Sequence, residues 1–325
     1  MFEKKLKGSY SNAYIQHLFK GSGSFVESLP NEINCLIVDE AHRLREKSGM
    51  FNNKGENQIK EIINASQFSI FFIDESQKVT ALDVGSIDMI GKYAKELDSE
   101  CRTMYLASQF RCNGSDGYLA WLDDVLEIRK TANFDFFDAD LNYDFRVFDD
   151  PQRMFDAISE KNLINNKSRV VAGYCWEWIS SGKNDSNVYD INVDEYDFHK
   201  SWNLYNTTTW AIDPESINEI GCIHTCQGLE FDYVGVIIGD DLRYENDEVI
   251  TDFSKRAGTD QSLKGLKTRA KKGDKEALEE CDLIIRNTYR TLMTRGMKGC
   301  YVFCTDKNLN DYLLQRLQRN NSDII

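Results

Sequence analysis

The chain has 325 residues and a formal net charge of −14, and hydrophobic residues make up 41% of it. This length suggests two domains, and the apolar share is large enough for real cores. No apolar run approaches the roughly 18 residues of a membrane span, and the first residues, "MFEKKLKGSY", contain no apolar signal core. We therefore expect neither a membrane span nor secretion by a signal peptide. A uniformly acidic surface would also repel nucleic acid, whose binding depends on Lys and Arg.

The cysteines indicate a reducing compartment. The chain has 9 of them, an odd number, and four lie in apolar runs: Cys35, Cys222, Cys300 and Cys304. Reduced cysteines are commonly buried in this way. The spacing between Cys222 and Cys226 also differs from the CxxC pairs of zinc ribbons. We expect a cytoplasmic protein without a structural metal.

Short apolar runs alternate with amphipathic stretches along the chain, which is typical of α/β units. Six continuous apolar runs predict strands covered on both faces of a parallel sheet: residues 35–38, 70–73, 103–106, 170–172, 234–238 and 301–304. Five stretches between them predict helices: residues 57–65, 87–97, 117–128, 151–162 and 284–293. Two Asp-rich segments, 133–144 and 184–197, predict surface insertions. A domain boundary is expected near residues 107–115.

Acidic pairs follow the first two predicted strands. Asp39 and Glu40 come directly after residues 35–38, and Asp74 and Glu75 follow the second run, with Gln77 two residues later. Ligands of parallel α/β sheets bind at the carboxyl ends of the strands. An acidic residue there can hold Mg²⁺ and a neighbouring Glu can activate water, while a neutral Gln can contact a γ-phosphate. The second pair alone is a weak signal, because such residues often cap helices.

Two arginines follow element ends further along the chain. Arg111 lies just past the third apolar run, and Arg295 follows a helix-like stretch. Arginine suits phosphate because its planar fork donates two hydrogen bonds, and at a helix end it can neutralise transition-state charge. The alternatives are a surface salt bridge for Arg111 and contacts to carbonyls of its own helix for Arg295.

The stretch "GCIHTCQGLEFDYVGVIIG" holds a polar turn before a buried strand, formed by Thr225, Gln227, Gly228 and Glu230. Gly228 allows a close approach of the backbone. The five tryptophans could stack on bases, but core packing is the better interpretation for most of them: Trp121, Trp176, Trp178, Trp202 and Trp210.

One basic segment interrupts the acidic sequence. Residues 264–275, "KGLKTRAKKGDK", are rich in Lys and Arg. They are either a solvated loop or helix face, or a local contact for phosphate. Because the segment has few apolar residues to bury, we expect a mobile surface insertion.

Six stretches, in order, resemble a superfamily 1 helicase, and more narrowly the Schlafen-like (group 3) DNA/RNA helicase domain. "LIVDEAHRL" is similar to the Walker B motif and "FFIDESQ" to the third helicase motif. "QFRCNGSDGYLAWL" resembles the start of the second motor domain. "AGYCWEW" and "IGCIHTCQGLEFDYVGVIIG" resemble later motifs, the second of them the fifth, and "YRTLMTRGMKG" resembles the sixth. The matches run from about residue 19 to 315.

The resemblance implies two RecA-like P-loop NTPase lobes with parallel sheets, residues 1–108 and 109–325. It assigns single-stranded nucleic acid as partner, and ATP and Mg²⁺ as cofactors only where a P-loop is supplied. It implies that Asp39 binds Mg²⁺, Glu40 activates water and Gln77 senses the γ-phosphate. It implies that Arg111 and Arg295 contact the triphosphate and face Asp39 and Glu40 across an interlobe cleft. Gly228 and Glu230 would bind the nucleotide, and His224 and Thr225 would bind nucleic acid.

The departure from the family lies before Asp39. Family members carry a P-loop there, whereas this sequence has no Gly-Lys-Ser/Thr; its Gly-Lys pairs, Gly91-Lys92 and Gly182-Lys183, precede Tyr and Asn. A P-loop supplies backbone N–H groups, a lysine and a hydroxyl for phosphates and Mg²⁺. We therefore expect a truncated domain whose first lobe is incomplete, with unpaired strand edges and exposed faces.

Two functions remain open from the sequence. The first is a fragment of a nucleic-acid-dependent ATPase, a helicase or translocase that is inactive without a missing N-terminal segment or a second polypeptide. The second is a non-catalytic nucleic-acid-binding or protein-interaction module derived from a helicase. The intact Asp39, Glu40, Arg111 and Arg295 favour the first.

Overall fold

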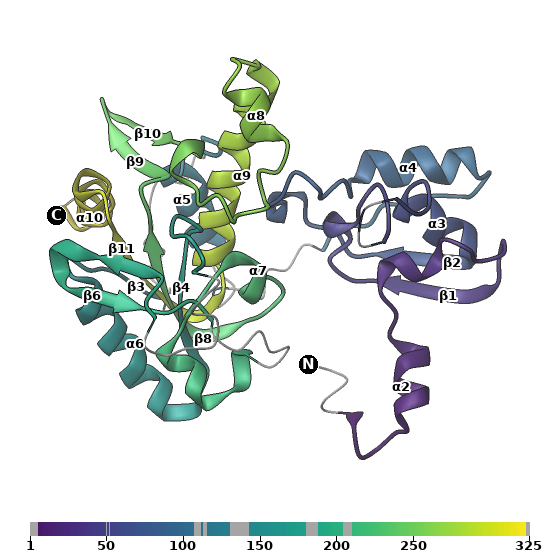
Figure 1. The fold of residues 1–325 in the computed structure, drawn as a ribbon, viewed down its shortest axis with the longest axis horizontal. Coiled ribbons are helices and arrows are strands. Elements are labelled where there is room, and N and C mark those ends of the chain that lie inside the picture. Colours follow the sequence, from purple (N-terminus) through teal and green to yellow (C-terminus); the bar gives the residue numbers. More distant parts are fainter. Residues whose placement is uncertain are drawn as a thin grey trace. The chain divides into compact units, whose positions relative to one another are not determined.

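The chain is an α/β protein that divides into two compact units, residues 1–105 and 106–325 (Figure 1). The computed structural model describes residues 6–49, 51, 53–106, 112, 116–130, 143–179, 188–203 and 210–322. No helix among these residues combines the length and apolar character needed to cross a membrane. The predicted boundary, at residue 108, lies a few residues beyond the division of the structure.

Unit 1 is built on a two-stranded parallel sheet of β1 (Ile33–Val38) and β2 (Ser66–Phe71). Its other elements are α2 (Asn12–Leu18), η1 (Ser22–Phe25), η2 (Ala41–Arg43), α3 (Gln58–Ala65), η3 (Glu75–Gln77) and α4 (Ile87–Glu96). Asn57 and Ser86 cap α3 and α4 by accepting hydrogen bonds from backbone N–H groups of the first turn, as such residues do at helix starts. These two strands and two helices were predicted, and the structure confirms them with shifts of up to four residues at their ends.

Among the described residues of unit 1, side chains cover one face of its sheet. Side chains of α3 and α4, among them Ile59 and Ile62, pack against Leu36 and Val38. The alternate residues point the other way, so Ile37 is 68% and Phe68 is 61% exposed. The expectation that these strands are buried on both faces is wrong, and Cys35 on the same uncovered face is exposed rather than buried. The expectation of exposed faces in this lobe agrees with the structure.

The predicted strand at residues 103–106 is wrong. These residues form no strand in the structure, and Met104, Tyr105 and Leu106 are each more than 80% exposed. An apolar run becomes a strand only where a neighbouring edge pairs with its backbone, and the described residues of unit 1 pair β1 with β2 alone.

Unit 2 is built on a five-stranded sheet of order β3-β11-β8-β4-β7 in which every neighbouring pair is parallel. The strands are β3 (Asp144–Val147), β4 (Ser168–Ala172), β7 (Ile220–Gly221), β8 (Phe231–Ile238) and β11 (Gly296–Cys304). The three predicted strands are the three central ones, β4, β8 and β11. Continuous apolar runs mark central strands because both of their faces are covered.

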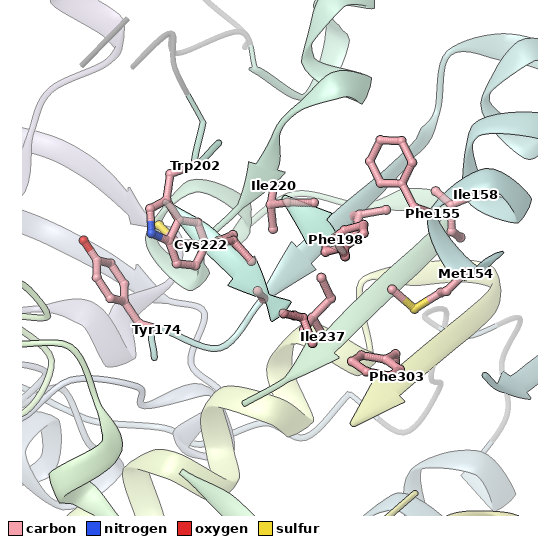
Figure 2. Close-up of a cluster of buried hydrophobic side chains, with 14 of the residues drawn as sticks. Met154, Phe155, Ile158, Tyr174, Phe198, Trp202, Ile220, Cys222, Ile237 and Phe303 are labelled. Atoms are coloured by element: carbon pink, nitrogen blue, oxygen red, sulfur yellow. The ribbon is translucent and has the colours of Figure 1, made fainter. Parts of the chain in front are cut away.

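Helices cover both faces of this sheet. On one face, α6 (Pro151–Asn165) packs Met154 and Ile158 against Ile237 and Phe303 (Figure 2). The opposite face bears Cys300, which lies against Tyr118 of α5 (Asp116–Val125). The hydroxyl of Tyr118 donates to the Met293 carbonyl at the end of α9 (Lys275–Met293), 3.0 Å away. The two helices are thereby joined on that face.

The remaining elements of unit 2 surround the sheet. They are β5 (Ile191–Val193), η6 (Asp194–Tyr196), β6 (Phe198–Lys200), η7 (Trp210–Ile212), η8 (Pro214–Asn218), α7 (Ile223–Cys226), β9 (Leu242–Glu245), β10 (Glu248–Thr251), η9 (Phe253–Lys255), α8 (Leu266–Ala270) and α10 (Lys307–Ser322). The three helices predicted here lie within or close to α5, α6 and α9, and α9 begins nine residues before its predicted start.

One further prediction is corrected, and another is tested only at its end. The segment 184–197, expected as a surface insertion, contains β5, whose Ile191 is fully buried; residues 184–187 lie outside the described residues. The segment 133–144 ends in β3, an edge strand, and residues 133–142 are not described. The aspartates made both segments look uniformly polar in the sequence, so the short apolar segments between them were not recognised as strands.

Two glycines of unit 1 have different surroundings, so we expect their replacement by alanine to change the stability of the unit in opposite directions. A Cβ at Gly85 would lie 1.9 Å from the Ala41 carbonyl oxygen, whereas a Cβ at Gly91 in α4 would meet nothing within 4 Å. We expect Gly85→Ala to destabilise unit 1 by about 1–3 kcal/mol because the backbone must move. Gly91→Ala should stabilise it by about 0.5–1 kcal/mol because glycine is a poor helix former.

Hydrogen exchange of peptides from β1 and α4 measures both changes in the full chain. Tryptophan fluorescence serves as the control, since all five tryptophans lie in unit 2. Unchanged or slower exchange in Gly85→Ala would contradict the close approach to Ala41.

Candidate functional site

The turn after β1 places the first acidic pair at the carboxyl end of the unit 1 sheet. Asp39 is exposed, and one of its carboxylate oxygens accepts a hydrogen bond from the Glu40 N–H at 2.9 Å. Glu40 has a φ of 52°, in the left-handed region that residues other than glycine rarely adopt. Its carboxylate lies 3.3 Å from Nε2 of the buried His42. The structure thus holds Glu40 in a strained and defined position, which is common at functional sites.

The second acidic pair lies at the same edge of the sheet. Val38 pairs with Phe71 in the parallel register, so the residues after both strands emerge side by side. Asp74 caps η3 by accepting from the Ser76 N–H, and its other oxygen accepts from the Gln77 side-chain amide at 2.6 Å. Gln77 is buried in this arrangement. Asp74 is therefore a helix-capping residue in the structure, as such residues often are. Sensing of the γ-phosphate by Gln77 stays a prediction.

In unit 2, three candidates for nucleotide contacts lie at the amino ends of β8 and β11. Gly228 has a φ of 78°, and Glu230 is exposed immediately before β8. Arg295 precedes β11, and its backbone carbonyl accepts from the Phe231 N–H at 2.8 Å. The three residues are brought together at this edge.

The Arg295 side chain is fully buried. Its Nε donates to the Thr291 carbonyl of its own helix at 2.9 Å, and Nη1 donates to the Leu229 carbonyl at 3.3 Å. The helix-carbonyl alternative is therefore seen in this structure. A role as an arginine finger stays a prediction, as does its position opposite Asp39 and Glu40. Arg111 lies outside the described residues.

The two candidates for nucleic-acid contacts lie at the opposite, carboxyl edge of the sheet. His224 and Thr225 belong to α7, which follows β7. The His224 ring lies 6.2 Å from the ring of Tyr174, just past β4, and Thr225 donates to the Asn203 side chain at 3.0 Å. The structure therefore separates these two residues from the Gly228–Glu230–Arg295 group.

The sequence reasoning missed a buried charge network at this carboxyl edge. Arg256 is fully buried, and its guanidinium lies 2.7 Å from Asp241 and 2.9 Å from Asp260. The Tyr289 hydroxyl donates to Asp241, and His224 lies 3.7 Å from Asp260. These charges come from segments that look like ordinary polar loops, so only burial marks them.

The pKa values of the two carboxylates beside Arg256 are shifted in opposite directions. Burial raises the pKa of Asp241, and the opposing charge of Arg256 compensates only partly. Burial also acts on Asp260, but the nearby His224, the Arg256 charge and hydrogen bonds from Ser262 hold its pKa well below the usual range. Asp260 is therefore negatively charged in the folded protein at neutral pH.

The tryptophans are mainly core residues, as the sequence favours. Trp121, Trp202 and Trp210 are buried, while Trp176 and Trp178 are half-buried and pack against the core of unit 2. The Trp176 indole N–H donates to the Asn192 carbonyl at 3.0 Å.

The acidic turn carries one carboxylate of the kind that binds Mg²⁺. Asp39 supplies an exposed carboxylate at a strand end, which suits Mg²⁺, an ion that commonly uses one or two carboxylates with waters and phosphate oxygens. No group of three or more potential ligands gathers among the described residues. Asp39 therefore fits as a single protein ligand beside a bound phosphate rather than as part of a complete protein cage.

Comparison with known families matches residues 1–306 to Schlafen group 3, DNA/RNA helicase domain. The chain belongs to this family. The match covers unit 1, unit 2 as far as residue 306 and all the motifs quoted above, so the resemblance inferred from those motifs is confirmed.

Two individual similarities accompany the family match. The chain is 28% identical over 307 residues to the uncharacterized protein YPL245W of Saccharomyces cerevisiae, covering 87% of this chain and 64% of that protein. It thus spans a little less than two thirds of that relative. A structure of S. cerevisiae Dbp5 bound to RNA and ADP BeF3 aligns over 91% of this chain and 59% of that one, at 13% identity and a TM-score of 0.26.

The Arg256 network predicts a large and specific stability effect. Arg256→Met should lower the free energy of unfolding of unit 2 by about 3–5 kcal/mol, because it leaves two buried carboxylates without the buried cation that neutralises them. Arg269→Met is the matched control: Arg269 also contacts two acids, Asp274 and Glu276, but on the surface. Such exposed pairs contribute about 0–1 kcal/mol.

Urea unfolding followed by tryptophan fluorescence measures both variants, since the tryptophans report on unit 2. Equal losses in the two variants would show that burial adds nothing to the Arg256 network.

Proposed function

We propose that this chain is part of a nucleic-acid-dependent ATPase of the helicase or translocase type and that it hydrolyses no ATP by itself. Membership of a DNA/RNA helicase domain family supports the first statement. The observation that carries the second is the pairing of an intact acidic turn, Asp39-Glu40, with a sequence that contains no Gly-Lys-Ser/Thr.

The proposed roles follow the local geometry. Asp39, exposed at the strand end, is the Mg²⁺ ligand, and Glu40 beside it orients and deprotonates the attacking water. Gln77 senses the γ-phosphate from the neighbouring strand end. Arg111 and Arg295 contact the triphosphate, with Gly228 and Glu230 near the nucleotide. Arg295 must first leave its two carbonyl partners to do so.

His224 and Thr225 are proposed to contact a single strand of nucleic acid. Both lie at the carboxyl edge of the unit 2 sheet, where His224 is partly exposed. The segment between Thr225 and β8 then runs to the Gly228–Glu230–Arg295 group. The proposed strand and nucleotide contacts would therefore lie at the two ends of one short stretch of chain.

A missing phosphate cradle explains the proposed inactivity. Phosphoryl transfer depends on positioning and charge neutralisation, with little covalent chemistry for the protein to perform. Asp39 helps to hold Mg²⁺ only when the β- and γ-phosphates are seated, and a P-loop seats them. Loss of one preorganised donor alone typically costs about 2.7–4 kcal/mol, or 10²–10³ in rate.

A second candidate is a non-catalytic nucleic-acid-binding module. The observation that favours it is that the described candidates already have intramolecular partners: Glu40 lies beside His42, Gln77 donates to Asp74, and Arg295 is bound to two carbonyls. In this case the motif residues stabilise the fold.

Phosphate release by the purified chain, with and without single-stranded nucleic acid, tests the proposal against Glu40→Gln. We expect no difference between the two proteins, and turnover well above that of the variant would contradict the proposal. A polypeptide bearing the family's P-loop segment is then added. Turnover that appears and depends on Glu40 supports the ATPase role, whereas nucleic-acid binding without any turnover supports the non-catalytic module.

A further inference from the structure

Residues 264–275, here called the basic arm, carry a concentrated positive charge on an acidic protein. They contain six basic residues and a single acidic one, Asp274, in a chain of net charge −14. The arm consists of α8 and the turns on either side of it, and it projects at the end of α9 that begins with Lys275 (Figure 1).

The arm has a buried inner side, so the expectation that it has little to bury is wrong. Leu266 and Ala270 of α8 are about 5% exposed and pack toward α9, where Ala277 is fully buried. The Lys267 ammonium donates to the carbonyls of Arg256 and Ala257 at 2.9 and 3.0 Å. The inner residues therefore attach the arm to the buried network.

A second set of contacts holds the base of the arm. Asp260 is paired with the buried Arg256, and Glu177 accepts hydrogen bonds from the N–H groups of Gly258 and Thr259. These hydrogen bonds lower the pKa of Glu177, chiefly through Gly258. A preorganised arm loses less entropy on binding than a flexible one.

The outer cations, which are the exposed lysines of the basic arm, are not neutralised by nearby acidic residues. The acids nearest in sequence, Asp274 and Glu276, are bound by Arg269 at 2.7 and 2.9 Å. The lysines that remain are exposed and form no ion pair within the described part of the chain: Lys264, Lys271, Lys272 and Lys275. A fixed element thus presents four unneutralised ammonium groups.

We propose that the basic arm is a second nucleic-acid contact, which binds the phosphate backbone without reading sequence. Lysines act as point charges that suit phosphates and release counterions on binding. The position of the arm agrees with this, because Asp260 at its base lies 3.7 Å from His224, a proposed strand contact. The inference rests on the proposed function in assuming that the chain binds nucleic acid.

Other partners fit the arm less well. Its apolar residues, Leu266 and Ala270, point inward and no aromatic residue lies in it, so it has nothing to insert into a membrane interface. Protein interfaces are enriched in aromatic residues and Arg and depleted in Lys, whereas the outer cations here are lysines.

The test is the affinity of the full chain for labelled single-stranded oligo(dT) and oligo(U) over a series of salt concentrations. The variant is Lys271→Ala/Lys272→Ala. Its matched control is Lys298→Ala/Lys307→Ala, which changes the net charge equally but removes exposed lysines already paired with Asp232 and Glu195. Melting temperatures check that both variants fold, as expected for exposed positions.

We expect the arm variant to bind about tenfold more weakly at about 0.1 M salt, with a salt dependence shallower by about 1.4 in the slope of log K, because each phosphate contact on a single strand contributes about 0.7. The control should match the unmodified chain in both quantities.

The outcomes separate the two proposals. If the unmodified chain binds and the arm variant binds equally well with the same slope, the arm inference is overturned while the proposed function stands. If the unmodified chain binds neither oligonucleotide, the arm inference and the proposed function are both contradicted. Loss of binding to phosphatidylserine vesicles in the arm variant, with unchanged oligonucleotide binding, would assign the arm to membranes and overturn the inference.

Discussion

The burial of Arg256 between Asp241 and Asp260 is the interaction on which the carboxyl edge of the unit 2 sheet depends. A guanidinium removed from water is stable only if carboxylates and hydrogen bonds replace its hydration. Those partners come from the segment after β8 and from the loop before α8, and Tyr289 of α9 adds its hydroxyl to Asp241. One charge thus joins three parts of the chain that are distant in sequence.

The same network connects structural and functional residues. Asp260 contacts both Arg256 and His224, so the residue that helps neutralise the core charge also holds a proposed strand contact in place. Lys267 extends the network into the basic arm through backbone carbonyls. The charged surface of an otherwise acidic protein is therefore attached to a buried ion-pair network rather than to a loose loop.

Unit 1 obeys a different constraint. Its two strands expose one apolar face, including Ile37 and Phe68, and the described residues of this unit place no helix on that face. Yet the turn after β1 is closely defined: Glu40 keeps a left-handed conformation, and Gly85 lies against the Ala41 carbonyl. The local geometry of the acidic turn is thus specified by neighbouring backbone and does not require a large sheet.

The sequence by itself determined the elements whose physical signal is local. Central parallel strands such as β4 and β8 are continuous apolar runs because both faces are covered, and the family motifs are contiguous strings that include Asp39-Glu40. Helices α3 and α6 were predictable for the same reason, since their periodicity and capping residues are local.

Only the tertiary structure decided which local signals are used. The run at residues 103–106 is as apolar as a strand but does not pair with β1 or β2, and the isolated residues of β5 became core because Ile191 meets other apolar side chains. Arg256 and Arg269 are indistinguishable as sequence, yet one is buried and the other lies on the surface. Burial and pairing are properties of several segments together, so no single stretch of sequence contains them.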